Sequence, residues 1–343
     1  MVEHDDNSIA ASPWTILDRE PLWIIKVTLD PHFRPDLMSD ETMERFRQTA
    51  PHLDQVSGTD IRQAIEAVIL QEEPGPALEW MLQTGALEQV LPELFATVAF
   101  SQEAGRLHKD VWEHTKQVVA QCPSRPIVRW AALLHDIGKV QTRTIDPKGK
   151  VQFLGHAEQG AAMFRRIAHR LEFSKEQARP IQFLILKHLR ANQYVGQWTD
   201  AAVRRFYRQM GNLLGDLLDL SRADITTGRK QRKRRLHAHL DELAGRIVRL
   251  KELDARTPNL PSGLGNQIME HFHLQTSPLI GDIKDFLEQA IQDGVLEPGR
   301  HAPYYVEYLE QNPSWHRDAD GRSQIAPDGP SHKGRSNFSH NRG

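Results

Sequence analysis

Apolar residues recur at helical spacing along most of this chain, and runs that alternate apolar with polar residues are scarce. The strand-like exceptions are short, at 23–29 and 151–153, and the first of them fits a helix equally well. A chain with so few strands must bury its apolar stripes by packing helix against helix. The sequence therefore predicts an all-α protein.

Composition limits where such a protein works. The 343 residues are 26% charged and 39% hydrophobic with a net charge of −2, which is ordinary for a globular protein and indicates no partner. The single cysteine, Cys122, rules out an internal disulfide framework and fits a reducing compartment. The acidic start lacks the apolar core of a secretory signal, and no apolar run reaches the length of about 18 residues that a membrane span needs. We expect a cytoplasmic protein with no membrane partner.

Changes in composition divide the chain into segments. A linker with prolines and glycines is predicted at 253–263, and the residues from 312 onward are polar and poor in apolar side chains. The expected segments are a disordered N-terminus (1–14), a neck-like helical region (15–100), a central helical domain (101–252), a C-terminal helical unit (253–311) and a disordered tail (312–343).

Capping and turn residues predict several helix boundaries. One or two helices are expected at 42–70, with Asp60 as a cap, and a helical hairpin broken at Gly85 is expected at 74–94. The last helical unit, 277–311, has a predicted turn at Asp293 and Gly294.

Several polar side chains of the central domain share a helix face with apolar residues. His114 is in phase with Val111 and Val118, and Asp224 continues a row of leucines. His188 follows a similar stripe. One buried histidine is usually a satisfied core residue, but an unpaired buried carboxylate is costly. Histidines and aspartates together on apolar faces therefore indicate a divalent metal site.

The stretch WAALLHDIGK, at 130–139, ends an apolar run with two polar residues. On a helix His135 and Asp136 point about 100° apart, so both reach one ion only near a helix end, which we expect Gly138 to supply. Lys139 has no acceptor atom for a metal, but its charge suits a phosphate oxygen.

This pattern resembles the HD superfamily of metal-dependent phosphohydrolases, with a histidine, a His-Asp doublet and a distant aspartate. The matching ligands are His114, His135, Asp136 and Asp224. His156 and His188 match two further histidines, which the resemblance assigns to a second ion, to the substrate phosphate or to acid–base catalysis. The resemblance implies one or two divalent ions (Mn²⁺, Mg²⁺, Ni²⁺ or Co²⁺) and catalytic roles for Asp136, Lys139, His156 and His188.

The chain also resembles the neck, HD and C-terminal regions of bacterial tRNA nucleotidyltransferases (CCA-adding enzymes) and poly(A) polymerase relatives, over roughly residues 15–310. The resemblance is carried, in the family's order, by SGTDIRQAIEAVIL, TGALEQVLPEL, LHKDVWEHT, GHAEQGA, RADITTGRKQ and IGDIKDFLEQAIQDGVLEP. It implies RNA, and tRNA in particular, as a partner rather than DNA.

The resemblance also includes a departure from the family. The family's base-reading Glu-Asp-x-x-Arg is here Arg19-Glu20-Pro21-Leu22-Trp23, and nothing before residue 15 supplies the family's nucleotidyltransferase head. We therefore expect no nucleotidyltransferase activity.

A basic run, RKQRKRR at 229–235, follows shortly after Asp224. Such a run is usually a solvated helix face, and the alternative is contact with a phosphate backbone. Arg229, Lys230 and Arg232, together with Lys139, are the expected phosphate-binding residues.

Three functions remain open at this point. The chain is expected to be a phosphohydrolase acting on a nucleotide, cyclic nucleotide or RNA end. The alternatives are a non-catalytic RNA-binding module derived from the body of a CCA-adding enzyme, and a subunit that serves a separate nucleotidyltransferase head.

Overall fold

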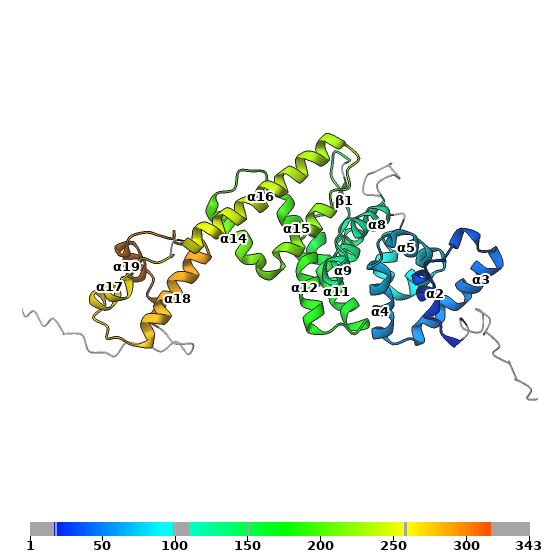
Figure 1. Ribbon diagram of the computed structural model, residues 1–343, viewed down its shortest axis with the longest axis horizontal. Coiled ribbons are helices and arrows are strands. Elements are labelled where there is room, and N and C mark those ends of the chain that lie inside the picture. Colours follow the sequence, from blue (N-terminus) through cyan, green and yellow to red (C-terminus); the bar gives the residue numbers. More distant parts are fainter. Residues whose placement is uncertain are drawn as a thin grey trace, which may run out of the picture. The chain divides into compact units, whose positions relative to one another are not determined.

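The computed structural model describes residues 17, 19–98, 100, 110–149, 151–256 and 259–316. Most of these residues are helical (Figure 1), and the one sheet among them is the antiparallel pair of β1 (Thr144–Ile145) and β2 (Val151–Gln152). The ambiguous stretch 23–29 is helical. The prediction of an all-α protein is confirmed.

The helices follow one another with short connections. Before residue 100 they are α2 (Trp23–Lys26), η1 (Val27–Leu29), η2 (Pro35–Leu37), α3 (Asp40–Thr49), η3 (Ala50–Gln55), α4 (Gly58–Ile69), α5 (Pro74–Gln83), α6 (Ala86–Val90) and α7 (Pro92–Phe95). The next group is α8 (Val111–Gln121), α9 (Pro126–Leu134), α10 (Lys139–Thr142), α11 (His156–Arg170), α12 (Lys175–Lys187), α13 (Leu189–Asn192), α14 (Asp200–Met210), η5 (Gly211–Leu213), α15 (Leu214–Ala223) and α16 (Lys230–Arg256). The last are α17 (Leu264–His271), α18 (Pro278–Gln292), α19 (Ala302–Gln311) and η6 (Pro313–His316).

Local chemistry explains several of these boundaries. Helix α4 is capped by Ser57, whose Oγ accepts the backbone N–H of Asp60 and donates to its carboxylate, so the predicted cap at Asp60 was wrong by one turn. Gly85 separates α5 from α6 with φ of 78°, and Gly294 follows α18 with φ of 74°. Both predicted breaks are confirmed, at positions where glycine tolerates the left-handed backbone.

The described residues form two compact units. Unit 1 comprises those up to Trp198 together with Gln209–Ile247, and unit 2 comprises Thr199–Arg208 together with those from Val248 onward. The described parts of the expected neck-like region, 15–100, and most of the expected central domain therefore fall within one unit.

Helix α9 runs through the core of unit 1. It packs against α4, α8, α12 and α15, and α12 packs in turn against α11 (Figure 1). Every residue from 128 to 134 is buried, as expected of a helix that is surrounded by others. The carboxyl end of α9 thus delivers the residues that follow it into the middle of the unit.

A buried arginine ties α9 to its neighbours. Arg129 is 4% exposed, and its guanidinium donates to the carbonyls of Cys122 and Ile69 at 2.8 Å, and to those of Pro123 and Gln71 at 3.2 Å. These carbonyls lie at or just beyond the carboxyl ends of α8 and α4, where the helix dipoles favour a cation.

Unit 2 has its own core, formed by α17, α18, α19 and η6. Trp315 in η6 is buried and donates to the carbonyl of Leu309 at 3.0 Å. Residues 313–316 are therefore folded, in contrast to the disordered tail that was expected for 312–343. Residues 317–343 of that tail and the expected disordered N-terminus, 1–14, lie outside the described residues.

The expected linker at 253–263 also starts too early. Helix α16 continues to Arg256, and Asp254 within it pairs with Arg204 of α14 at 2.7 Å.

Among the residues that the structure describes, no helix combines the length and apolar character needed to cross a bilayer.

Candidate metal centre

Six side chains from five helices of unit 1 converge at the end of α9. His114 lies on α8, and His135 and Asp136 directly follow α9. His156 is the first residue of α11, whereas His188 and Asp224 are the C-caps of α12 and α15. Most of these positions are helix ends, where a side chain can point along the helix axis into a shared space.

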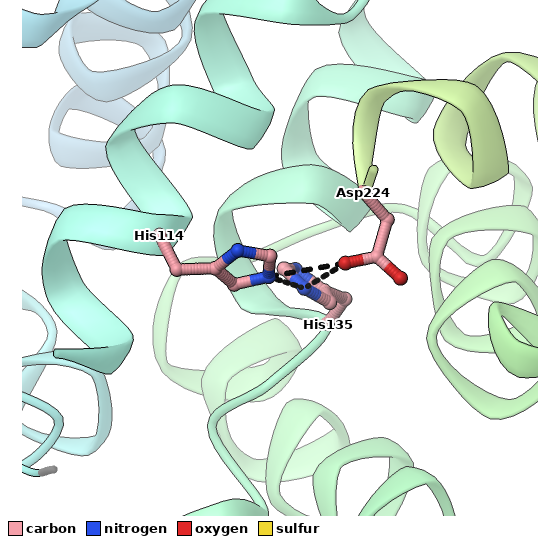
Figure 2. A group of neighbouring side chains, drawn as sticks. All are labelled: His114, His135 and Asp224. Carbon is pink, nitrogen blue, oxygen red and sulfur yellow. Dashed lines mark hydrogen bonds and ion pairs between the residues drawn. The ribbon is translucent and has the colours of Figure 1, made fainter. Parts of the chain in front are cut away.

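The first group is formed by His114, His135 and Asp224, which point toward one another (Figure 2). His114 Nε2 lies 3.2 Å from His135 Nε2 and 3.0 Å from Asp224 Oδ1. His135 Nε2 lies 3.7 Å from the same carboxylate oxygen.

The second group is formed by Asp136, His156 and His188. Asp136 Oδ1 lies 3.5 Å from His156 Nε2 and 3.9 Å from His188 Nε2, and the two imidazole nitrogens are 3.3 Å apart. The other oxygen of Asp136, Oδ2, lies 3.4 Å from His114 Nε2 and 3.2 Å from His135 Nε2. Asp136 therefore stands between the groups and faces each with one oxygen.

These spacings fit metal coordination. Ligands about 2.1 Å from one ion lie roughly 3.0–3.4 Å from their neighbours in octahedral or tetrahedral geometry. Each group has donor atoms at about this spacing, and mixed imidazole and carboxylate donors suit divalent transition ions. The residues present therefore fit a divalent metal.

Hydrogen bonds orient the imidazoles. The Nδ1 atoms of His135, His156 and His188 donate to the carbonyls of Ala132, Phe153 and Ile185, at 2.8, 2.7 and 2.7 Å. A carbonyl only accepts, so Nδ1 carries the proton in each ring and Nε2 faces the centre.

Opposite charges on the histidine and carboxylate side chains stabilise one another in the buried centre. Burial disfavours a charged His135, but the Asp136 and Asp224 carboxylates outweigh this and raise the pKa of His135 to about 10. Burial likewise opposes charge on the two carboxylates. The charges of His135 and Lys139 nevertheless hold the pKa of Asp136 well below its usual range, and hydrogen bonds with His114 and His135 lower the pKa of Asp224 in the same way. A divalent ion would take the place of the proton on His135, so ion binding releases a proton.

His188 behaves in the opposite way. Burial and the neighbouring charge of His135 lower the pKa of His188 to about 4. Its imidazole is therefore neutral at physiological pH, which is the state in which histidine binds a metal.

Lys139 lies beside the centre, as the sequence predicts. Its Nζ is 2.6 Å from Asp136 Oδ2 and 5.5 Å from the centroid of the Phe153 ring. The ammonium thus contacts the oxygen that faces the first group.

Gly138 has a different role from the one expected. Its φ is −68°, which any residue adopts, so it is not needed as a helix-ending glycine. A Cβ at this position would lie 2.1 Å from the carbonyl oxygen of His156 and 2.6 Å from the nitrogen of Gly160. Glycine is required because the chain after α9 touches the backbone of α11, and this contact brings His156 to Asp136.

The expected phosphate-binding residues of the basic run are not part of this convergence. Arg229, Lys230 and Arg232 are exposed at the start of α16. Lys233 in the same turn donates to Gln121 at 3.3 Å, and Gln121 donates to the carbonyl of Ala223 at 2.8 Å. The start of α16 is thereby attached to α8 and α15, the helices that present His114 and Asp224.

Two neighbours of the centre were not predicted from the sequence. Thr226 Oγ1 lies 2.8 Å from His114 Nδ1, and Asn192 donates to Asp224 Oδ2 at 3.4 Å. Neither interrupts an apolar stripe, and the only available signal for Thr226 is its place two residues after Asp224. The single cysteine, Cys122, is buried, and burial raises the pKa of its thiol to about 12, so it is not poised as a nucleophile.

Comparison with known proteins places this centre in a family context. Residues 107–229 match the HD domain family. The chain is 29% identical to the CC-adding tRNA nucleotidyltransferase of Thermus thermophilus over 79% of its own length, and 29% identical to the A-adding tRNA nucleotidyltransferase of Deinococcus radiodurans over 74%. A multifunctional CCA protein of Methylobacillus flagellatus is 27% identical over 50% of the chain and 42% of the relative.

The match covers 59% of the length of each of the first two relatives. The six converging side chains lie within the matched HD segment. The chain thus contains an HD domain and is homologous to CCA-adding tRNA nucleotidyltransferases over its HD and C-terminal regions.

Proposed function

We propose that this chain is a metal-dependent phosphohydrolase that acts on the phosphoester of a nucleotide, a cyclic nucleotide or an RNA end. The observation that carries the proposal is the position of Asp136 between two groups of ligand atoms, each at coordination spacing. A purely structural cluster would need only to neutralise two carboxylates. In this cluster the Nε2 atoms of four histidines face carboxylate oxygens, with two of these histidines in each group.

The ligand roles follow from the two groups. His114, His135 and Asp224 would hold one ion, His156 and His188 a second, and Asp136 would bridge them. Bound divalent ions, Mn²⁺, Mg²⁺, Ni²⁺ or Co²⁺, would lower the pKa of a water molecule and withdraw charge from the phosphoester. The use of two ions rather than one is part of this proposal.

Lys139 would neutralise charge on the substrate phosphate. Its ammonium reaches Asp136 Oδ2 in this structure, so a phosphate oxygen next to that atom would lie within its range. His156 and His188 could alternatively transfer protons. Their Nδ1 atoms are committed to carbonyls, and the low pKa of His188 makes it a poor proton donor near neutral pH, so we assign both to the ion.

The test is hydrolysis of 2′,3′-cyclic AMP and of a bis-aryl phosphodiester by protein stripped of metal, with each of the four ions added back singly. The proposal predicts turnover that depends on an added ion and is lost in Asp136→Ala. Asp241→Ala, on an exposed part of α16, is the matched control and should keep full activity. Absence of turnover with every ion, in a folded protein, contradicts the proposal.

A second function, RNA binding without catalysis, is favoured by the start of α16. The helix opens with cations and has no acidic residue in its first turn, although the helix dipole favours acids there. Phosphates bound at this end would relieve the repulsion, and the similar proteins are named as acting on tRNA. This function predicts RNA binding that survives chelation of metal and weakens with salt.

The expectation that the chain does not add nucleotides also remains a proposal. Trp23, which stands where the family's base-reading arginine was expected, stacks on Phe46 with ring centroids 5.9 Å apart. Its ring is used in packing and offers little for base selection. Incorporation of labelled CTP or ATP into tRNA by the purified protein would contradict this part of the proposal.

A further inference from the structure

His114 differs from the other histidines of the centre in the hydrogen-bond partner of its Nδ1 atom, the ring nitrogen that faces away from the centre. Backbone carbonyls accept from the Nδ1 atoms of the other imidazoles, which fixes the proton on those atoms. The Nδ1 of His114 instead meets the hydroxyl of Thr226 at 2.8 Å. A hydroxyl can donate or accept, so the backbone does not impose the tautomer of His114.

Thr226 is coupled to the centre through the chain itself. The turn after α15 is stabilised by bonds from the Thr226 N–H to the Asp224 carbonyl, at 2.9 Å, and from the Ile225 N–H to the Arg222 carbonyl, at 3.2 Å. Ile225 is 5% exposed, which anchors the turn in the core. Asp224 Oδ1 lies 3.0 Å from His114 Nε2, so one tripeptide contacts both nitrogens of the ring.

The two arrangements of this contact have different consequences for an ion. If Nε2 carries the proton, it donates to Asp224 and Thr226 donates to Nδ1, which leaves Nε2 with no lone pair for a metal. If Nδ1 carries the proton, it donates to Thr226 Oγ1 and Nε2 offers its lone pair to the centre. The Thr226 hydroxyl can form the hydrogen bond of either arrangement. In the second it accepts the Nδ1 proton of His114, which makes that arrangement possible in a part-buried position.

We propose that Thr226 is the positioning residue of the first metal group, and that it allows His114 to become a ligand by accepting the Nδ1 proton. The inference rests on the proposed function, since it requires that the centre binds divalent ions. It also predicts a difference between the two groups. The orientation of His114 in the first group depends on a side-chain hydroxyl, whereas both histidines of the second group are oriented by backbone carbonyls. Removing the partner of a ligating histidine typically lowers metal affinity by about 10–100-fold.

The test is calorimetric titration of metal-free full-length protein with Mn²⁺ and, separately, Co²⁺. Thr226→Val removes the hydroxyl with little change of shape, and Thr226→Ser keeps it. We expect Thr226→Val to weaken the binding of one ion by about 10–100-fold, with the second ion unchanged, and Thr226→Ser to bind both ions nearly as the unaltered protein does. Thermal unfolding in a chelator controls for loss of the fold.

A double-mutant cycle separates positioning from a general structural effect. In a His114→Ala background the Thr226→Val change should have no further effect on ion affinity, because its partner is gone. Equal ion affinity of Thr226→Val and the unaltered protein, or a loss that persists undiminished in the His114→Ala background, would overturn the inference. Failure of the unaltered protein to bind any ion overturns the proposed function instead, and with it the premise of this inference.

Discussion

Lys139 Nζ lies 2.6 Å from Asp136 Oδ2, the same oxygen that faces His114 and His135. The ammonium and an ion of the first group would therefore share one carboxylate oxygen. Under the proposed function, Lys139 would lower the negative charge available to the ion and would keep a cation beside the substrate phosphate.

Replacement of this lysine should separate ion binding from turnover. Lys139→Met removes a cation that repels the ion, so we expect unchanged or tighter ion binding, whereas turnover of 2′,3′-cyclic AMP falls about 100-fold because the phosphate loses its partner. Calorimetry and steady-state kinetics measure the two effects. Lys139→Arg, which keeps the charge, should retain more activity than Lys139→Met; the reverse order would refute the assigned role.

The position of Asp136 between the two groups predicts that variants of Asp136 and of Asp224 bind different numbers of ions. Asp136→Asn should abolish tight binding of both ions, because its oxygens face both groups. Asp224→Asn should abolish only one, because Asp224 Oδ1 faces only the two histidines of the first group, His114 and His135. Metal analysis after dialysis measures this directly, and the prediction fails if the two variants retain the same number of ions.

The combined contribution of His135 and His188 to the stability of the metal-free protein should be greatest near pH 6.5. The pKa of His135 rises from 6.5 to about 10 on folding, so its contribution to stability is lost as the pH rises from about 6.5 through 10. The pKa of His188 falls from 6.5 to about 4, so the unfolded chain binds more protons and stability is lost as the pH falls from about 6.5 through 4. The low pKa values of Asp136 and Asp224 add to the loss below about pH 4.

Calorimetric melting temperatures in a chelator, from pH 4 to pH 10, measure this profile. Saturation with a metal ion should flatten the alkaline side, because ion-bound His135 no longer holds a proton to lose. His188→Asn should flatten the acidic side. A profile that is unchanged by both would show that these two histidines do not determine it.

Gly138→Ala should damage both stability and the second metal group. The new Cβ would meet backbone atoms of α11, which cannot rotate away, so we expect a loss of about 1–3 kcal/mol and a displaced His156. Gly75 in α5 is the matched control, because a Cβ there meets nothing within 4 Å. Gly75→Ala should be neutral or stabilising by up to about 1 kcal/mol. Chemical denaturation measures both changes; equal stability of the two variants would contradict the packing argument.

Removal of charge at the start of α16 tests the proposal that this end of the helix binds RNA. Changing Arg229, Lys230 and Arg232 to Gln should weaken RNA binding and lower the slope of log affinity against log salt by about 2, while hydrolysis of a small cyclic nucleotide stays unchanged. Changing the exposed cations Arg165, Arg166 and Lys175 of α11 and α12 to Gln is the control for lost charge alone. Equal slopes for both triple variants would indicate a solvated face with no role in binding.

Five of the six converging side chains could be found from the sequence because each breaks a local rule, whereas His156 was matched only through the family resemblance. Asp224 and His188 continue apolar stripes, and His135 with Asp136 ends one, so helical phase alone predicts that they face inward. The helical fold follows from the same periodicity. These predictions depend only on neighbours within about two turns.

Other features depend on contacts between distant segments, which phase does not reveal. Thr226 meets His114 across more than a hundred residues, and Gly138 is constrained by the backbone of α11 rather than by its own φ. The cap at Ser57 was missed for a smaller reason, because serine and aspartate three residues apart both suit a cap and only the backbone shows which one begins the helix. The ordered chain extends past residue 312 because Trp315 packs against the core that α17, α18 and α19 form.

The hydrogen bonds of Arg129 bear on how modular the HD domain is. Two of its carbonyl acceptors, those of Ile69 and Gln71, come from the region before residue 100, and Trp130 beside it donates to Glu66 of α4 at 2.9 Å. A fragment cut to begin at residue 101 would lose these acceptors and would also uncover the face of α9 that packs against α4. The helix that positions His135 and Asp136 would then lose part of its support. We therefore expect the helices before residue 100 to be needed for the fold of the candidate metal centre, so the domain should not be transferable to another protein without them.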